Sequence, residues 1–243
     1  RRQRQMCIRD RLCTLLTPTS GTITWDGQDI FSLGSAYRNL LGYLPQDFGY
    51  YPDFSVQDYL LYIASIKGLR PATARQRMQN LLEQVGLTQV RRQKMKKLSG
   101  GMKQKLGLCC SLVSSPPLIL LDEPTVGVDP LSRRELWSIL KQFSGEEGVG
   151  VLVSTSYMDE SAYCNRTLIM YEGRLLMDAP PADVIARAEG MCVTVRTPEG
   201  LHARQFQSRL AAVSGIINAT PQGNTVRIIV PHGHPARKKL EEY

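Results

Sequence analysis

The sequence lacks any long apolar segment. No run of apolar residues approaches the roughly 18–20 that are needed to cross a bilayer. The basic opening is not followed by the sustained apolar stretch of a secretory signal. From the residues alone we therefore expect a protein that is soluble or lies on a membrane surface.

Patterns typical of disulfide frameworks and metal sites are also missing. None of the six cysteines belongs to a CxxC pair, and Cys109 and Cys110 adjoin within an apolar stretch. This favours reduced cysteines that pack as small hydrophobic side chains. The only histidines are His202, His232 and His234, all near the C-terminus. The last two have no third ligand nearby, which favours a surface turn over a metal site.

Strong charge of one sign is confined to the opening. The formal net charge is +8, and residues 1–11, with five arginines and one aspartate, contribute half of it. The remaining +4 is too small to argue for nucleic-acid binding. The basic run at 91–97 is interpreted as a solvated connection.

Helices and apolar strands alternate along most of the chain, which predicts an α/β core. A smaller α+β appendage is expected at the C-terminus. The predicted helices are 56–67, 72–85, 99–114, 131–143, 181–188 and 203–213. The predicted strands are 22–26, 42–44, 118–121, 149–154, 166–171, 174–177, 191–196 and 225–230, with 118–121 and 149–154 expected to be buried.

Two adjacent carboxylates follow one of these strands in "LILLDEP". Because ligands sit at the carboxyl ends of strands in α/β sheets, Asp122 and Glu123 are candidate site residues. One carboxylate can support Mg²⁺ and the other can orient or deprotonate a water. The plain structural alternative is an acidic turn at the end of a strand.

A second candidate is "LSGGM". Ser99 is a good helix N-cap, whereas Gly100 and Gly101 in the first turn each cost up to about 1 kcal/mol relative to alanine. A helix start that brings backbone N–H groups close to a phosphate explains these glycines. A flexible loop before a core helix does not explain why Ser-Gly-Gly directly adjoins the helix.

Together these motifs resemble the nucleotide-binding domain of ATP-binding-cassette (ABC) transporters. "LSGGM" is similar to the family's signature motif and "LILLDEP" to its Walker B strand. Gln46 in "YLPQD" resembles the Q-loop glutamine, and "VGVD", ending at Asp129, resembles the D-loop. The resemblance covers about residues 12–188 and implies a P-loop NTPase-like core with a helical subdomain at about 47–97.

The resemblance implies a mechanism that uses ATP and Mg²⁺. Asp122 would support Mg²⁺, Glu123 would be the general base, and Gln46 would touch Mg²⁺ or the attacking water. Two such domains would sandwich ATP, so that Ser99, Gly100, Gly101 and Met102 contact nucleotide held by the partner. Asp129 would lie at the dimer seam. The implied partners are a second ABC ATPase domain and a membrane permease, with no nucleic acid. The implied location is the cytoplasmic face of the plasma membrane.

One departure from the family pattern concerns "VSTSYMDE". The family has a histidine that contacts the γ-phosphate where this chain has Ser156. Serine is shorter and cannot carry a positive charge, so we expect slow hydrolysis at this site. With "KLSGGMKQKLGLCC" and "TVGVDPLSRRELW", this segment resembles the first ATPase half of exporters that carry two ATPase halves on one polypeptide.

The second departure is the absence of a G-x-x-x-x-G-K-[ST] phosphate loop. Its lysine should fall roughly two helical turns before Leu12. Those positions hold "RRQRQMCIRDR", in which "QMCIRD" matches a translated transposon end used in sequencing libraries. We predict that residues 1–11 are an assembly artefact, that the parent protein is an ATPase, and that this chain alone is inactive.

These residues leave three hypotheses of function. The first is the motor domain of an ABC exporter. The second is a soluble, ribosome-associated ABC ATPase, for which a basic patch or arm insertion is expected. The third is a catalytically weak half that lends its LSGGM signature to a partner site. In each, residues 189–243 form a C-terminal appendage or linker.

Overall fold

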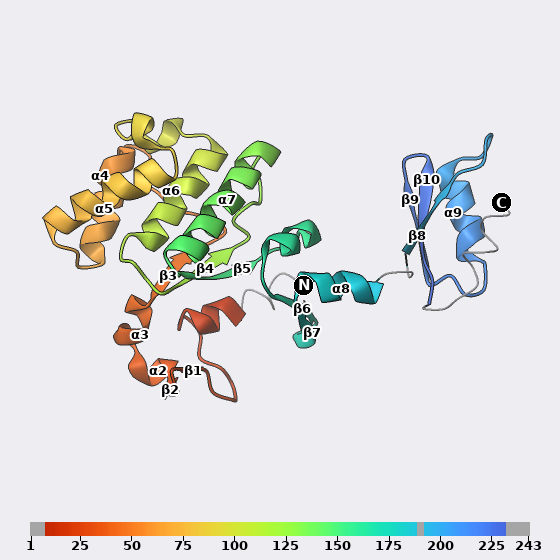
Figure 1. Ribbon diagram of the computed structural model, residues 1–243, viewed down its shortest axis with the longest axis horizontal. Coiled ribbons are helices and arrows are strands. Elements are labelled where there is room, and N and C mark those ends of the chain that lie inside the picture. Colours follow the sequence, from red (N-terminus) through yellow and green to blue (C-terminus); the bar gives the residue numbers. More distant parts are fainter. Residues whose placement is uncertain (1–7, 189–191, 232–243) are drawn as a thin grey trace. The chain divides into compact units, whose positions relative to one another are not determined.

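The computed structural model describes residues 8–188 and 192–231 (Figure 1). The chain divides into two compact units, each with a hydrophobic core of its own. The first unit runs to Tyr163 and includes Tyr171–Arg174. The second comprises Cys164–Met170 and the chain from Leu175. His232, His234 and the most N-terminal part of the opening lie outside the described residues.

A parallel sheet of three strands forms the centre of the first unit, in the order β3-β4-β5. In register, Leu118 of β4 pairs with Leu41 of β3 and with Gly150 of β5. Because the strands are parallel, their carboxyl ends share one edge of the sheet. The strands are β3 (Leu41–Leu44), β4 (Leu118–Asp122) and β5 (Gly150–Ser154).

β5 forms where a strand is predicted, but the prediction that it is buried is wrong. Leu152 is 39% exposed, whereas Ile119 to Leu121 of β4 are buried. The physical reason is its position in the sheet. Among the described residues β5 pairs only with β4, so it is an edge strand despite a sequence typical of a central one.

Helices pack on each other and on this sheet. α6 contacts β3, and α4 and α5 pack against α6 (Figure 1). Ser55 caps α4 by accepting a hydrogen bond from the Asp58 N–H, and Pro71 begins α5 at the position that tolerates proline. The elements are α4 (Val56–Ile66), α5 (Pro71–Gln84), η1 (Thr88–Val90), η2 (Met95–Lys97), α6 (Gly100–Leu112), α7 (Pro130–Glu146) and η3 (Met158–Tyr163).

The part before β3 packs as a small core around Ile30 and Tyr37, and the Tyr37 hydroxyl donates to the Leu12 carbonyl. Residues 8–12 are helical and end in a Schellman motif: Leu15 N–H donates to Asp10 C=O (2.7 Å) and Thr14 N–H to Arg11 C=O (3.0 Å). The following elements are β1 (Thr24–Trp25), β2 (Gln28–Asp29), α2 (Ile30–Leu33) and α3 (Ser35–Asn39).

The described part of the second unit contains most of the β6-β7 hairpin, two helices and a three-stranded antiparallel sheet of order β8-β10-β9. Phe206 and Leu210 of α9 pack on the sheet. β9 was not predicted, because Pro221 within it is unfavourable in a strand. The elements are β6 (Thr167–Tyr171), β7 (Arg174–Ala179), α8 (Pro181–Ala188), β8 (Cys192–Arg196), α9 (Ala203–Ala211), β9 (Asn218–Gln222) and β10 (Thr225–Ile229).

Candidate functional site

Asp122 ends β4 and is almost completely buried. Its carboxylate accepts a hydrogen bond from the Ser154 hydroxyl at the end of β5 (3.0 Å). The other carboxylate oxygen forms an ion pair with the Arg9 guanidinium. The sequence predicted the carboxylate at this edge of the sheet but not its arginine partner, since only the packing of the opening helix brings Arg9 there.

Glu123 follows directly and has a left-handed backbone, with φ of 43°. Such a conformation is uncommon for a residue other than glycine, and strained residues of this kind cluster at active sites as well as in turns. The Glu123 N–H donates to the Ser154 carbonyl (2.9 Å), which extends the pairing of β4 with β5 by one residue. Its Oε2 atom is buried and has no hydrogen-bond partner among the described residues. An unpartnered carboxylate oxygen fits a water or a cation bound beside it.

The predicted helix N-terminus at "LSGGM" also forms. The Ser99 hydroxyl caps α6 by accepting a hydrogen bond from the Met102 N–H (3.2 Å). The N–H groups of Gly100 and Gly101 have no partner within the helix, as at any helix start. Gly101 has a packing reason that the sequence did not reveal: a Cβ there would meet the Ser132 Oγ atom of α7 at 2.5 Å.

Gln46 lies two residues beyond β3, beside the start of α6. It shares a cavity of about 260 Å³ with Gly100 and with Gly127 of the predicted D-loop. The segment after Gln46 is anchored to α6, because Lys103 Nζ donates to the Tyr50 hydroxyl (2.7 Å). Three motifs that are separate in sequence therefore meet at one cavity.

Asp129 is the N-cap of α7. Its carboxylate accepts hydrogen bonds from the N–H groups of Ser132 (3.0 Å) and Leu131 (3.1 Å), and these bonds lower the pKa of the carboxyl group, the bond from Ser132 most. The predicted role of Asp129 at a dimer seam stays a prediction. The structure gives it a role within the domain as well, since the cap fixes where α7 begins.

Ser156 is exposed and lies two residues beyond β5. Next to it the Thr155 hydroxyl accepts from the Tyr157 N–H (3.0 Å) and donates to the buried Glu160 carboxylate (2.6 Å). The Thr125 hydroxyl donates to the same carboxylate, also at 2.6 Å. This network could not be predicted from the sequence, in which its only signals are a threonine after "DEP" and a glutamate near Ser156.

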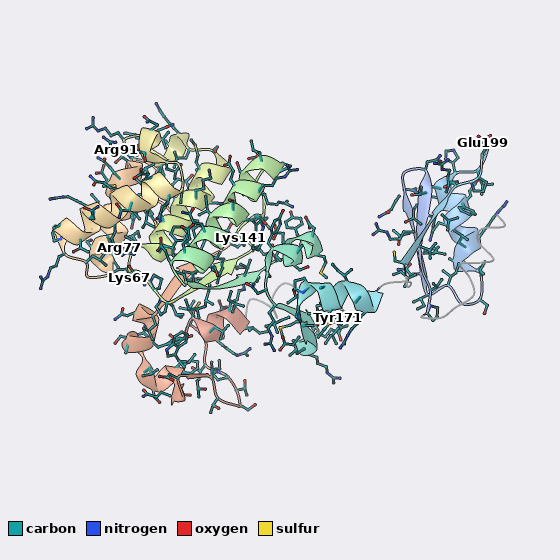
Figure 2. The ribbon with its side chains drawn as sticks, viewed as in Figure 1. Lys67, Arg77, Arg91, Lys141, Tyr171 and Glu199 are labelled. Atoms are coloured by element: carbon teal, nitrogen blue, oxygen red, sulfur yellow. The ribbon has the colours of Figure 1, made fainter. Side chains whose placement is uncertain are left out.

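The basic run at 91–97 is partly neutralised. Lys96 and Lys94 both form ion pairs with Asp53, at 2.8 and 3.4 Å. Figure 2 shows Arg77 and Arg91 on the side of the unit formed by α4 and α5. The pairing supports the interpretation of this run as a solvated surface.

Comparison with known proteins identifies the family. A family model described as ABC transporter matches residues 8–126. The linearmycin resistance ATP-binding protein LnrL of Bacillus subtilis (strain 168) is 31% identical over 221 residues, which cover 90% of this chain and 70% of the relative. The chain belongs to the ABC transporter ATP-binding family.

Other relatives and solved structures extend the comparison. The probable multidrug ABC transporter ATP-binding protein YbhF of Escherichia coli (strain K12) is 40% identical over 220 residues, 90% of this chain and 38% of the relative's length. The chain therefore spans well under half of that protein. A solved structure of cbiO1 from Clostridium perfringens, part of the ABC transporter complex cbiONQ, is 27% identical with a TM-score of 0.69 and 76% coverage of both chains. This ABC ATPase chain thus has the predicted P-loop NTPase-like fold.

The residues fit the ATP chemistry of the family only in part. The unpartnered Glu123 oxygen fits a water or a cation, whereas the Asp122 carboxylate is already paired with Arg9 and Ser154. The sequence contains no G-x-x-x-x-G-K-[ST] run, and its first lysine is Lys67. None of the helices in the described ranges combines the length and apolar character that a membrane crossing requires.

Proposed function

We propose that this chain is part of an ATP-driven motor domain of an ABC exporter, coupled to a membrane permease. The observation that carries the proposal is the common edge of β4 and β5, where Asp122 ends β4 and Glu123 and Ser156 follow the two strands. The names of the relatives support export: besides the multidrug and linearmycin resistance proteins, a Burkholderia lata relative is a Nod factor export ATP-binding protein.

Each site residue has a proposed role. Asp122 supports Mg²⁺, and Glu123 orients and deprotonates the attacking water through its unpartnered oxygen. Gln46 senses the occupied site and relays its state to the helical subdomain that follows it, whose first residues are anchored to α6 by the Lys103–Tyr50 bond. Ser156 stands at the γ-phosphate position, where a neutral hydroxyl stabilises developing charge less than a histidine can.

A second face, at the start of α6, serves a partner domain. Ser99, Gly100, Gly101 and Met102 present the N-terminus of a 13-residue helix, which favours a phosphate group. Asp129 lies at the seam between the two domains. In this arrangement the chain completes a nucleotide site whose phosphate loop belongs to its partner.

The helical subdomain is the proposed contact with the permease. Tyr51 and Tyr62 are 52% and 37% exposed and pack edge-on, 5.8 Å apart, while Tyr59 beneath them is buried. The exposed rings and Ile66 form an aromatic and apolar surface suited to a protein partner. Because Tyr59 is buried, the aromatic cluster of Tyr51, Tyr59 and Tyr62 also serves as a local hydrophobic core.

The N-terminal segment decides whether the chain can bind ATP itself or only complete the site of a partner. We propose that residues 1–11 are foreign and that Arg9 therefore stands beside Asp122 where the parent protein leaves room for Mg²⁺. Without a phosphate loop, the chain as it stands acts only as a signature donor. With that loop, the same residues form a complete ATP site.

The test compares two proteins by calorimetric titration with Mg-ATP and by phosphate release. One is the chain as it stands; the other replaces residues 1–11 with a strand, a G-x-x-x-x-G-K-[ST] loop and about two turns of helix that lead into Leu12. We expect no ATP binding by the first and micromolar binding with hydrolysis by the second. Glu123→Gln in the second protein should keep binding and lose hydrolysis.

Each outcome addresses a separate part of the proposal. Micromolar ATP binding by the unaltered chain would show that the proposal for residues 1–11 is wrong. Absence of binding by the repaired protein, if it is folded, would refute the motor-domain function. Hydrolysis that survives Glu123→Gln would refute the role of Glu123 as the base.

A further inference from the structure

Glu160 is a fully buried carboxylate that no step of the proposed function uses. It lies on η3, and its side chain reaches between the two loops that follow β4 and β5. Oε1 accepts from the Thr125 hydroxyl and Oε2 from the Thr155 hydroxyl, each at 2.6 Å. Both bonds lie at the short end of the range for hydroxyl donors in proteins.

The two threonines belong to the segments that carry the site. Thr125 stands two residues after Glu123 and begins the turn toward the D-loop, where the Val128 N–H donates to its carbonyl (3.2 Å). Thr155 immediately precedes Ser156. One carboxylate therefore links the segment with the base to the segment at the γ-phosphate position.

The surroundings hold the carboxylate in place. The Glu160 N–H donates to the Tyr157 carbonyl (3.1 Å), and the Arg133 Nε atom of α7 lies 3.8 Å from Oε1. The Arg133 guanidinium also lies over the Tyr157 ring, 4.3 Å from its centre. A buried polar side chain is tolerated where it has such partners.

We infer that Glu160 is a positioning residue, which sets the distance between the Glu123 and Ser156 segments through its bonds to Thr125 and Thr155. The inference deepens the proposed function and rests on it for its consequence in hydrolysis. In structural terms, the loop after β4 and the loop after β5 are coupled through Glu160. Removing the bond from one threonine should therefore loosen the loop that carries the other threonine.

The experiment measures amide hydrogen exchange in the chain as it stands, with no nucleotide, so its result does not depend on whether the chain hydrolyses ATP. Thr155→Val keeps the shape of the side chain and removes the hydroxyl. We expect it to speed exchange of the Val126 and Val128 amides, on the other loop, by about tenfold. Thr125→Val should likewise speed exchange of the Tyr157 amide.

Thr→Ser variants provide the matched comparison. Thr125→Ser and Thr155→Ser lose a methyl group but keep the hydroxyl, so exchange on the opposite loop should stay at the wild-type rate. A role in packing alone predicts the reverse, since valine preserves packing and serine does not. Ser161→Ala, on the same short helix with its hydroxyl bonded to Met158 C=O, is the control and should change neither loop.

Two results would overturn the inference. In the first, each valine substitution affects exchange only within its own loop. In the second, exchange rises by the same factor throughout the first unit, including the amides of β4, which indicates a general loss of stability. Hydrolysis data on the repaired protein test the proposed function separately.

Discussion

Two glycines within helices, Gly107 and Gly145, should respond to alanine in opposite directions. Gly107 lies in α6, where an added Cβ would meet Leu44 Cδ1 at 2.6 Å and the Phe48 ring at 3.3 Å. Gly145 lies in the last turn of α7, where a Cβ would meet nothing within 4 Å. At both sites alanine has a higher helix propensity than glycine. The sites differ in whether there is room for the added methyl group.

The magnitudes follow from these distances. Alanine in place of glycine stabilises a helix interior by about 1 kcal/mol, and less in a last turn. Overpacking a well-packed core costs about 1–3 kcal/mol, and Leu44 is 1% exposed with little room to move. We expect Gly107→Ala to lower the free energy of unfolding by about 1 kcal/mol and Gly145→Ala to raise it by about 0.5 kcal/mol.

Thermal unfolding followed by tryptophan fluorescence is a suitable assay. Both tryptophans, Trp25 and Trp137, lie in the first unit, so the signal reports on the unit that contains both substitutions. The expected difference corresponds to a Tm separation of about 3–6 °C between the variants. If Gly107→Ala is as stable as Gly145→Ala, then α6 does not pack against Leu44 and Phe48 as closely as described, and the reasoning is refuted.

Three further predictions concern stability and catalysis. Thr14→Gly should raise the free energy of unfolding by about 1 kcal/mol, because Thr14 has a φ of 57° that only glycine adopts without strain; Thr14→Ala, measured by urea unfolding, should give no such gain. Burial raises the pKa of the Cys109 and Cys110 thiols above the ordinary 9.0, so the unfolded chain releases these protons first and stability should fall as the pH rises above 9.0. Replacing both cysteines with alanine should flatten that decline between pH 8 and 10 in urea titrations, and an unchanged slope would contradict the assignment. Ser156→His in the full-length parent protein should raise its ATPase rate, and no gain would show that serine does not limit this site.

Much of the secondary structure could be predicted from the residues alone. Helices predicted at 56–67 and 72–85 appear as α4 and α5 with ends within one residue. The apolar periodicity of these segments and the N-cap at Ser55 are local properties, which explains the agreement. The turn between β1 and β2 is equally local, since Asp26 and Gly27 both adopt the positive φ that an Asp-Gly pair favours.

Other elements escaped prediction because their cause is not local. β9 contains Pro221 and lacks clear alternation, yet it pairs with β10 along its whole length. The exposure of Leu152 depends on how many neighbours β5 has, and a strand's own residues do not determine that number. In both cases pairing with another segment decided the outcome.

The sequence by itself determined the family and the candidate residues, because motifs such as LSGGM and LILLDEP are contiguous and their order is preserved. Only the tertiary structure decided which of these residues touch. It placed Arg9 against Asp122, Ser132 against Gly101, and one buried carboxylate, Glu160, between two loops. The physical reason is that burial and hydrogen-bond partners depend on segments far apart in the chain.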